Sequence, residues 1–331
     1  MSLSGTTRVP LLFGTSESLT AIHSTVTLVP RRQRNSDLTE CADILAVFRS
    51  RGNTELDTAR MYGAGSTEKL LFKLDLSDFT IDTKVYPVKP GDHEPTALRA
   101  TFFASLEALA RKKVRVLYLH APDRSVPFEE TLKEMNKLHQ EGFYEIFGLS
   151  NFAAWEVAEV VSICKAKGWV QPKIYQAMYN AITRAIEPEL VPCCRKFGIR
   201  VVVYNPPAGG LFAGKLTSLT DAPTTGRFNT GTLSGKMYRD RYLRNGNFDA
   251  LNHLKVVAAQ HDLRLTGIAL RWCQHHSVLG EGDGVILGAS SANQLKQNCE
   301  DSAKGPLPDA VVAAIDEAWE ISKGTASAYW R

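Results

Sequence analysis

The sequence predicts an α/β fold, a closed (β/α)8 TIM barrel with an extended loop after its seventh strand and an extra helix near its C-terminal end. Three observations predict it. Short apolar runs alternate with stretches of helical periodicity along the chain, which is typical of parallel sheets. Runs such as Val201-Val202-Val203-Tyr204 are apolar almost throughout, as in strands covered by helices. The 331 residues suit one barrel of roughly 250 residues with insertions. An open doubly wound sheet is the alternative.

Eight strands and eight helices account for the alternation. Runs of aliphatic and β-branched residues predict strands, which we place at residues 9–14, 54–58, 80–85, 115–120, 144–150, 174–177, 199–204 and 285–288. Apolar residues at helical spacing predict the helices that follow them, which we place at residues 38–51, 67–74, 96–110, 128–141, 155–167, 187–197, 265–276 and 293–300.

Two stretches fall outside this alternation. Residues 211–260 are rich in Gly, Thr and Arg and end in a helix expected near residues 248–260. A loop this long inside a compact domain is usually functional. Residues 306–323 carry apolar residues at helical spacing and predict an additional helix that packs on the barrel. Because no internal repeat or low-complexity linker occurs, we expect a single domain over residues 1–331.

Composition excludes several classes of protein. Apolar residues make up 44% and charged residues 22% of the chain, which excludes a disordered or collagenous protein. A net charge of +4 is too small to indicate nucleic acid or a membrane surface as a partner. The six cysteines show no C-x-x-C spacing, so we expect reduced, mostly buried thiols. With no apolar leader and no apolar run long enough for a membrane span, a cytoplasmic protein is expected.

Familiar catalytic and nucleotide-binding motifs are missing. The nearest approach to G-x-G-x-x-G, Gly63-Ala64-Gly65, breaks at Glu68, and neither a P-loop nor a G-x-S-x-G elbow occurs. His275 and His276 are adjacent, whereas a metal site on one helix face needs spacing i, i+4. We therefore expect no metal.

Four polar side chains stand at or just after the carboxyl ends of the second, third and fourth predicted strands, where sites of this fold lie. They are Asp57, Tyr62, Lys84 and His120. Each alone is compatible with a structural role, such as a helix cap, a rim residue or a solvated amine. Together they come from neighbouring strands, so we expect their side chains to converge.

This set matches the needs of carbonyl reduction. A phenol has a reference pKa of about 10. An ammonium about 4 Å away favours the phenolate by roughly 4 kcal/mol at an effective dielectric constant of 20, or about three pKa units. We therefore expect Lys84 to acidify Tyr62, Asp57 to hold Lys84, and a neutral His120 to donate a hydrogen bond to a carbonyl oxygen.

The motifs around these residues resemble those of the aldo-keto reductases. The segment 55–63 is similar to the family's Asp-Thr-Ala-x-x-Tyr motif, and Thr83-Lys84, Leu119-His120 and 148–152 resemble its Lys, His and Ser-Asn segments. Further segments look like the aflatoxin-aldehyde reductase (succinic semialdehyde reductase) subfamily, namely 175–181, 204–215, 226–228, 238–241 and 329–331. The resemblance covers most of residues 40–331.

The resemblance implies a metal-independent reductase that uses NADPH, with Tyr62 as the proton donor and Asp57, Lys84 and His120 as supporting catalytic residues. It implies that Ser150, Asn151 and Gln176 hold the nicotinamide carboxamide. It assigns the pyrophosphate and adenosine to Asn205, Gly209, Gly210, Leu211, Gly214, Lys215 and Arg227. It assigns the 2′-phosphate side to Gly288, Ser290, Ser291, Gln294, Gln297 and Asn298. It assigns an acidic or dicarbonyl substrate to His120, Tyr238, Arg241 and Arg331.

One segment departs from the family pattern. After Gly14-Thr15 the family has a short loop that lines the nicotinamide site, whereas residues 16–36 are longer and have no clear counterpart. They are either an insertion or non-native sequence. Displacement of the first loop would weaken cofactor binding while leaving the four catalytic residues in place.

The sequence thus predicts an NADPH-dependent reductase of aldehydes or ketones, with a small-molecule carbonyl substrate. The alternatives are a non-catalytic, cofactor-binding regulatory subunit, as the voltage-gated potassium-channel β-subunits are, and a barrel inactivated by its N-terminal insertion. The physiological substrate and the oligomeric state, including a homodimer, stay open.

Overall fold

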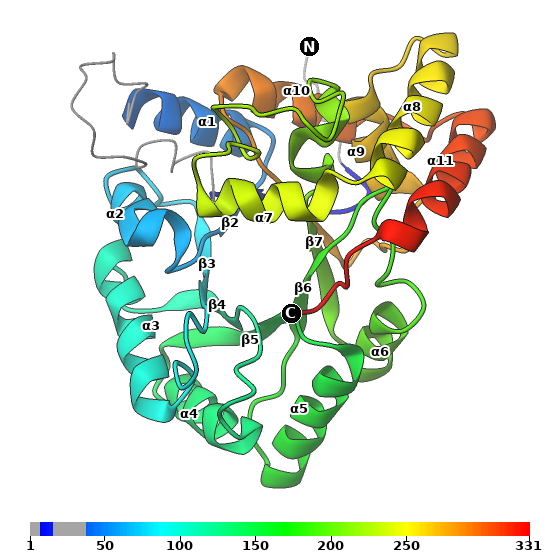
Figure 1. Ribbon diagram of the computed structural model, residues 1–331. Coiled ribbons are helices and arrows are strands. Elements are labelled where there is room, and N and C mark those ends of the chain that lie inside the picture. The colour runs from blue at the N-terminus through cyan, green and yellow to red at the C-terminus, as the bar shows by residue number, and fades with distance from the viewer. Residues whose placement is uncertain (1–6, 16–37) are drawn as a thin grey trace.

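Eight parallel strands close into a barrel in chain order in the computed structural model, which describes residues 7–15 and 38–331 (Figure 1). The strands are β1 (Leu11–Gly14), β2 (Glu55–Asp57), β3 (Thr80–Val85), β4 (Val114–Leu119), β5 (Tyr144–Ser150), β6 (Ile174–Met178), β7 (Arg200–Tyr204) and β8 (Gly284–Leu287). Pairing of β1 with β8, in which Leu12 lies opposite Ile286, closes the barrel. The predicted fold is confirmed. Residues 16–36 lie outside the described residues, so the single domain and its atypical segment stay predictions.

The predicted barrel helices are present, with shifted ends. They are α1 (Leu38–Ser50), α2 (Ser66–Leu71), α3 (Pro95–Leu109), α4 (Phe128–Gln140), α5 (Ala154–Lys167), α6 (Leu190–Phe197), α9 (Leu265–His275) and α10 (Ala292–Ser302). Figure 1 shows the helices surrounding the strands. Glycines end two of them, because Gly168 after α5 and Gly198 after α6 adopt the left-handed conformation that turns the chain toward the next strand.

The segment after β7 contains more structure than its sequence predicts. A 3-10 turn, η2 (Ala208–Ala213), is followed by α7 (Leu233–Tyr242) and α8 (Asn245–Gln260). The expectation of a loop at α7 is wrong. The helix was not predicted because it is short and polar and lacks an apolar stripe. Thr232 caps its amino end, where the side chain accepts a hydrogen bond from the amide of Gly235. The predicted terminal helix, α11 (Asp309–Ser322), is confirmed and packs against α8 (Figure 1).

The barrel interior is filled by side chains. Alternate residues of a strand point to opposite faces, and the inward set forms its own apolar cluster, consisting of Leu12, Val116, Tyr118, Ile174, Val202 and Ile286. A larger apolar cluster lies between the strands and the helices. The interior is therefore a packed core and not a pore, and the chemistry has to lie at an end of the barrel.

Gly148 on β5 makes room for the largest of these inward side chains. A Cβ atom at position 148 would lie 2.3 Å from Cδ1 of Tyr118, which is fully buried. We expect Gly148→Ala to cost about 1–3 kcal/mol of unfolding free energy, since overpacking displaces a ring that cannot move. Urea denaturation measures it. Gly282→Ala, where a Cβ would meet nothing within 4 Å, is the control. Equal midpoints for the two variants would contradict this account of the core.

The cysteines and helices agree with the sequence analysis on two points. Five of the six cysteines are buried, which confirms the expectation of mostly buried thiols. Within residues 7–15 and 38–331, no helix combines the length and apolarity needed to cross a membrane.

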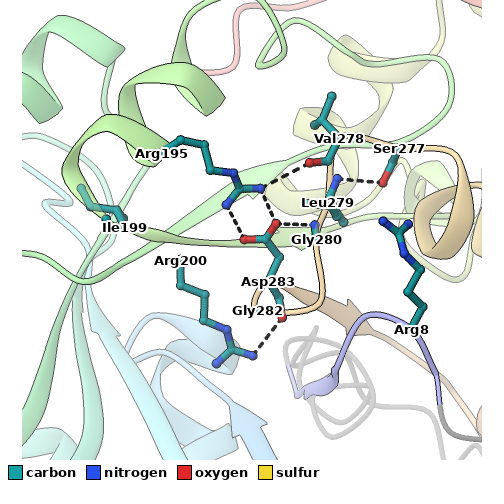
Figure 2. Close-up of a pocket in the computed structure, with 11 residues that line it drawn as sticks. Arg8, Arg195, Ile199, Arg200, Ser277, Val278, Leu279, Gly280, Gly282 and Asp283 are labelled. Carbon is teal, nitrogen blue, oxygen red and sulfur yellow. Dashed lines mark hydrogen bonds and ion pairs between the residues drawn. The ribbon is translucent and has the colours of Figure 1, made fainter.

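A surface depression of about 530 Å³ lies at the amino ends of β7 and β8 (Figure 2). Asp283 is buried there, and its carboxylate accepts hydrogen bonds from the guanidinium of Arg195 and from the amides of Gly280 and Val201. These contacts join the start of β7 to the turn before β8. The depression lies at the opposite end from the carboxyl ends of the strands, and its polar groups hold β7 against the turn before β8.

Candidate active site

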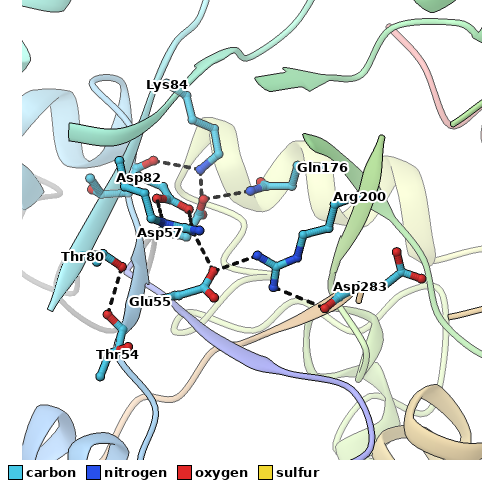
Figure 3. A network of polar contacts seen from close by, with 11 residues as sticks. Thr54, Glu55, Asp57, Thr80, Asp82, Lys84, Gln176, Arg200 and Asp283 are labelled. Carbon is cyan, nitrogen blue, oxygen red and sulfur yellow. Dashed lines mark hydrogen bonds and ion pairs between the residues drawn. The ribbon is translucent and has the colours of Figure 1, made fainter. Parts of the chain in front are cut away.

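A buried ion pair lies at the carboxyl ends of β2 and β3. Nζ of Lys84 donates to Oδ2 of Asp57 at 2.6 Å and to the carbonyl oxygen of Thr58 at 2.8 Å. The side chains of Lys84 and Asp57 are 0% and 3% exposed. From β6, Gln176 donates through Nε2 to Oδ1 of Asp57 at 2.8 Å (Figure 3). Both carboxylate oxygens are thereby engaged, which is what a charged pair needs to persist away from water.

Tyr62 lies directly beside this pair. It opens the turn η1 (Tyr62–Gly65) after β2, in which Gly63 and Ala64 have positive φ values of 56° and 51°. Nζ of Lys84 lies 5.2 Å from the centre of the Tyr62 ring. The ring of His120, which follows β4, meets Tyr62 edge-on, with centroids 5.9 Å apart. The structure therefore brings together the four residues that the sequence singled out.

The expected acidification of Tyr62 is wrong. Burial raises the pKa of Tyr62 well above 10, and the negative charge of Asp57 raises it further. Lys84 does not reverse this, because its ammonium is bonded to Asp57, which offsets its charge, and because it lies over the ring of Tyr62. The phenol therefore keeps its proton at neutral pH, and a proton donor must do so.

His120 is held neutral, as the sequence analysis expected. Burial lowers the pKa of His120 well below 6.5, and the positive charges of Lys84 and Arg331 lower it further. A neutral imidazole carries one N–H donor. Its Nδ1 atom is buried and finds no hydrogen-bond partner among residues 7–15 and 38–331. The backbone amide of Arg331 donates to the carbonyl oxygen of Asn151 at 3.0 Å, which places the C-terminal residue at this end of the barrel (Figure 1).

The predicted nicotinamide residues line the same end. Asn151, after β5, has φ 61° and donates through Nδ2 to the carbonyl oxygen of His120 at 2.7 Å and to Oγ of Ser150 at 3.0 Å. Its Oδ1 accepts a hydrogen bond from the hydroxyl of Tyr204. Gln176 donates a hydrogen bond through Nε2 to Asp57, and this contact was not predicted from the sequence. Among the described residues, the amide oxygen of Gln176 and the hydroxyl hydrogen of Ser150 have no hydrogen-bond partner, so they could bond a ligand.

A second cluster lies after β7 and joins residues far apart in the sequence. Nη1 of Arg227 donates to Oδ1 of Asn205 at 2.9 Å and to the hydroxyl of Tyr238 at 3.2 Å. Tyr238 is buried, and a Cβ at Gly209 would lie 2.7 Å from its ring. Arg227 also reaches β8, since a Cβ at Gly288 would lie 2.9 Å from its Nη2. Predicted substrate residue Tyr238 therefore packs among the predicted cofactor residues.

The amino end of α10 gathers most of the remaining predicted residues. Ser291 caps the helix, accepting a hydrogen bond through its side chain from the amide of Gln294. Oε1 of Gln294 accepts hydrogen bonds from the amide and the hydroxyl of Ser290. Asn298 donates to the carbonyl oxygen of Gly288 at 3.2 Å. A helix amino end favours an anion, and here the carboxylate of Glu40 accepts a hydrogen bond from the amide of Ala292 at 2.8 Å.

Three predicted residues stand apart from these contacts, whereas Arg241 joins the cluster around Tyr238. Lys215 and Gln297 are exposed, and Leu211 is fully buried in the apolar core. Arg241 lies over the Tyr238 ring, 5.9 Å from its centre. Tyr86, whose ring contacts His120, was not among the residues predicted from the sequence. Its position just after β3 and two residues after Lys84 was the available signal, since alternate residues of an extended chain share a face.

A second set of charged side chains lies beneath the Asp57–Lys84 ion pair, toward the amino ends of the strands (Figure 3). Arg115 donates to both carboxylate oxygens of Asp82 and to Oε2 of Glu55. Nη1 of Arg200 donates to the same Glu55 oxygen at 3.1 Å. Despite Arg115, burial raises the pKa of Asp82 to about 7.

Asp82 should therefore make stability depend on pH. Because its folded-state pKa is raised, its contribution is complete below an unfolded pKa of about 4 and is lost as pH rises through about 7. We expect the unfolding free energy of the wild type to exceed that of Asp82→Asn by less at pH 8 than at pH 5. Urea denaturation at the two pH values measures the difference. Asp240→Asn, on an exposed carboxylate, should show no such trend. A difference that widens toward pH 8 would refute the assignment.

Comparison with known proteins gives one family. The model of the aldo/keto reductase family matches residues 27–320. The chain is 42% identical over 312 residues to human "Aldo-keto reductase family 7 member A3", covering 90% of this chain and 94% of that protein. It is 42% identical to "Aflatoxin B1 aldehyde reductase member 2" of Mus musculus, covering 90% and 85%. It is 36% identical to "Aldo-keto reductase pigE" of Monascus ruber, covering 87% and 89%.

Proposed function

The chain belongs to the aldo/keto reductase family and is a carbonyl oxidoreductase, and on that premise we propose that it reduces aldehydes or ketones to alcohols with NADPH, with Tyr62 as the proton donor. The observation that carries the proposal is the convergence of Tyr62, His120 and the buried Asp57–Lys84 pair at one end of the barrel. A protonated phenol and a neutral imidazole next to each other provide a proton donor and a hydrogen-bond donor for one carbonyl oxygen.

The residues present fit NADPH. At Gly210, φ is 100° and a Cβ would meet nothing within 4 Å, so a phosphate can approach the backbone closely. Arg227 lies between η2 and β8, where its guanidinium can pair with phosphate oxygens. The amino end of α10, with Ser290 and Ser291, suits the 2′-phosphate.

The chain's own residues have distinct tasks in the proposed reaction. When bound, NADPH supplies the hydride for the carbonyl carbon. His120 donates a hydrogen bond to the carbonyl oxygen, and Tyr62 transfers its phenolic proton to the same oxygen. Gln176 and Lys84 together hold both oxygens of Asp57, which fixes the charged pair beneath Tyr62.

The substrate proposed is an acidic or dicarbonyl compound. Arg331 lies at the mouth, close enough for its charge to act on His120, and Arg241 packs over Tyr238. Guanidinium groups bind carboxylates and carbonyl oxygens through paired donors. One relative's name specifies an aflatoxin B1 aldehyde. The cytoplasmic location and a homodimer stay predictions.

Turnover with purified protein tests the proposal. We expect NADPH to quench tryptophan fluorescence, and NADPH oxidation at 340 nm to follow addition of succinic semialdehyde or 4-nitrobenzaldehyde. Quenching without turnover on any carbonyl would favour the regulatory-subunit alternative. Absence of quenching would favour a barrel inactivated by residues 16–36.

A further inference from the structure

We propose that Tyr86 is a positioning residue for His120, its ring holding the imidazole in the orientation from which it donates to the carbonyl oxygen. The inference rests on the proposed function and adds to it a residue that neither the sequence motifs nor the four-residue cluster includes. It starts from two observations, the missing hydrogen-bond partner of His120 Nδ1 and the edge-on packing of two tyrosines against the imidazole ring.

The backbone of His120 is fixed by hydrogen bonds, but in the part of the chain that the structure describes the Nδ1 atom of its ring has no such partner. The amide of His120 donates to the carbonyl oxygen of Val85 at 2.9 Å, and its own carbonyl oxygen accepts from Nδ2 of Asn151 at 2.7 Å. The second nitrogen of a functional histidine usually makes the hydrogen bond that sets its tautomer and orientation. Here Nδ1 is buried without such a bond. Something other than a hydrogen bond has to hold the ring.

Two aromatic rings supply that restraint. Tyr86 lies 5.4 Å from the imidazole centroid at an interplanar angle of 88°, and Tyr62 lies 5.9 Å away at 82°. Both values are those of edge-to-face packing, a favoured geometry for aromatic pairs. Tyr62 also has to move its proton, whereas Tyr86 contacts His120 without taking part in the proton transfer.

Tyr86 is itself placed by rigid structure. It directly follows β3 and stands two residues after Lys84, so both side chains project from the same face of the chain. Pro87 follows it, and a residue before proline is restricted to extended backbone. Tyr86 is half-buried, and among the described residues its hydroxyl makes no hydrogen bond. The ring of Tyr86 is therefore the part that acts, and not its hydroxyl.

Packing of Tyr86 also helps to exclude water from His120. The charged or titratable groups that act on this imidazole are Lys84, Arg331 and His93, all of which lower its pKa, while burial is the largest cause of that lowering. Loss of the Tyr86 ring would admit water to one face of His120. The pKa of His120 would then rise toward its usual value, and its orientation would broaden.

The test compares two substitutions that differ in one property. Tyr86→Leu keeps an apolar side chain but removes the ring face, whereas Tyr86→Phe keeps the ring and removes only the hydroxyl. For Tyr86→Leu we expect kcat with succinic semialdehyde to fall about tenfold, since misorientation of a catalytic group is costly, while the Kd for NADPH from fluorescence quenching stays unchanged. For Tyr86→Phe we expect wild-type kcat.

A second readout follows His120 directly. In protein labelled with 13C-histidine, with His120→Ala used for assignment, we expect the His120 resonance to titrate at higher pH in Tyr86→Leu than in the wild type or Tyr86→Phe. Wild-type kcat and an unshifted titration in Tyr86→Leu would overturn the inference. A loss of kcat shared equally by Tyr86→Phe would also overturn it. If His120→Ala and Tyr62→Phe themselves retain full turnover, the proposed function fails instead.

Discussion

Replacing Tyr62 with phenylalanine is expected to lower kcat by about 10²- to 10⁴-fold, the usual contribution of a positioned general acid. The phenol keeps its proton because burial and Asp57 raise its pKa well above 10. Tyr62→Phe preserves the ring, including its face toward Lys84 and its edge contact with His120. The loss should therefore appear in kcat, measured as NADPH oxidation, and the Kd for NADPH should be unchanged.

A matched control removes another phenol hydroxyl. Tyr144 donates its hydroxyl to the carbonyl oxygen of Met135 at 2.8 Å, beneath the helices and away from the cluster. Tyr144→Phe should cost about 1 kcal/mol of stability and leave kcat unchanged. Undiminished turnover in Tyr62→Phe would remove this residue from the reaction and, with it, the assignment of the proton donor.

Replacing Lys84 with methionine is expected to have the largest effect on stability. The substitution leaves the buried carboxylate of Asp57 without its cationic partner. The hydrogen bond from Gln176 then remains as its side-chain contact. Breaking a buried pair by removing one partner costs about 3–5 kcal/mol. Turnover should also fall, because the pair beneath Tyr62 is lost. Urea denaturation and NADPH oxidation measure the two effects.

A double variant separates stability from catalysis. Asp57→Asn combined with Lys84→Met removes both charges, and replacing a buried pair as a whole is often nearly neutral. We expect the double variant to regain most of the unfolding free energy that Lys84→Met loses, but none of the turnover. Recovery of turnover would mean that the pair only supports the fold. A wild-type urea midpoint in Lys84→Met would contradict the pairing itself.

The sequence alone determined the order of the elements and the residues at the ends of the strands. Apolar runs and helical spacing are local properties of the chain, and they identified eight strands that the structure confirms. Because the carboxyl ends of the strands of a parallel barrel meet at one end, the positions of Asp57, Lys84 and His120 were sufficient to predict their convergence. The short polar helix α7 was missed, because it lacks the stripe on which such predictions depend.

The surroundings of each group depend on how distant segments pack. Whether the pKa of Tyr62 is raised or lowered depends on burial and on the hydrogen bond of Lys84 to Asp57. Both arise when distant segments pack. In the same way, Gln176 on Asp57 and Tyr86 on His120 are contacts between different strands. Spacing along a chain defines which side chains share a face, whereas electrostatics depends on distances and solvent exclusion in three dimensions.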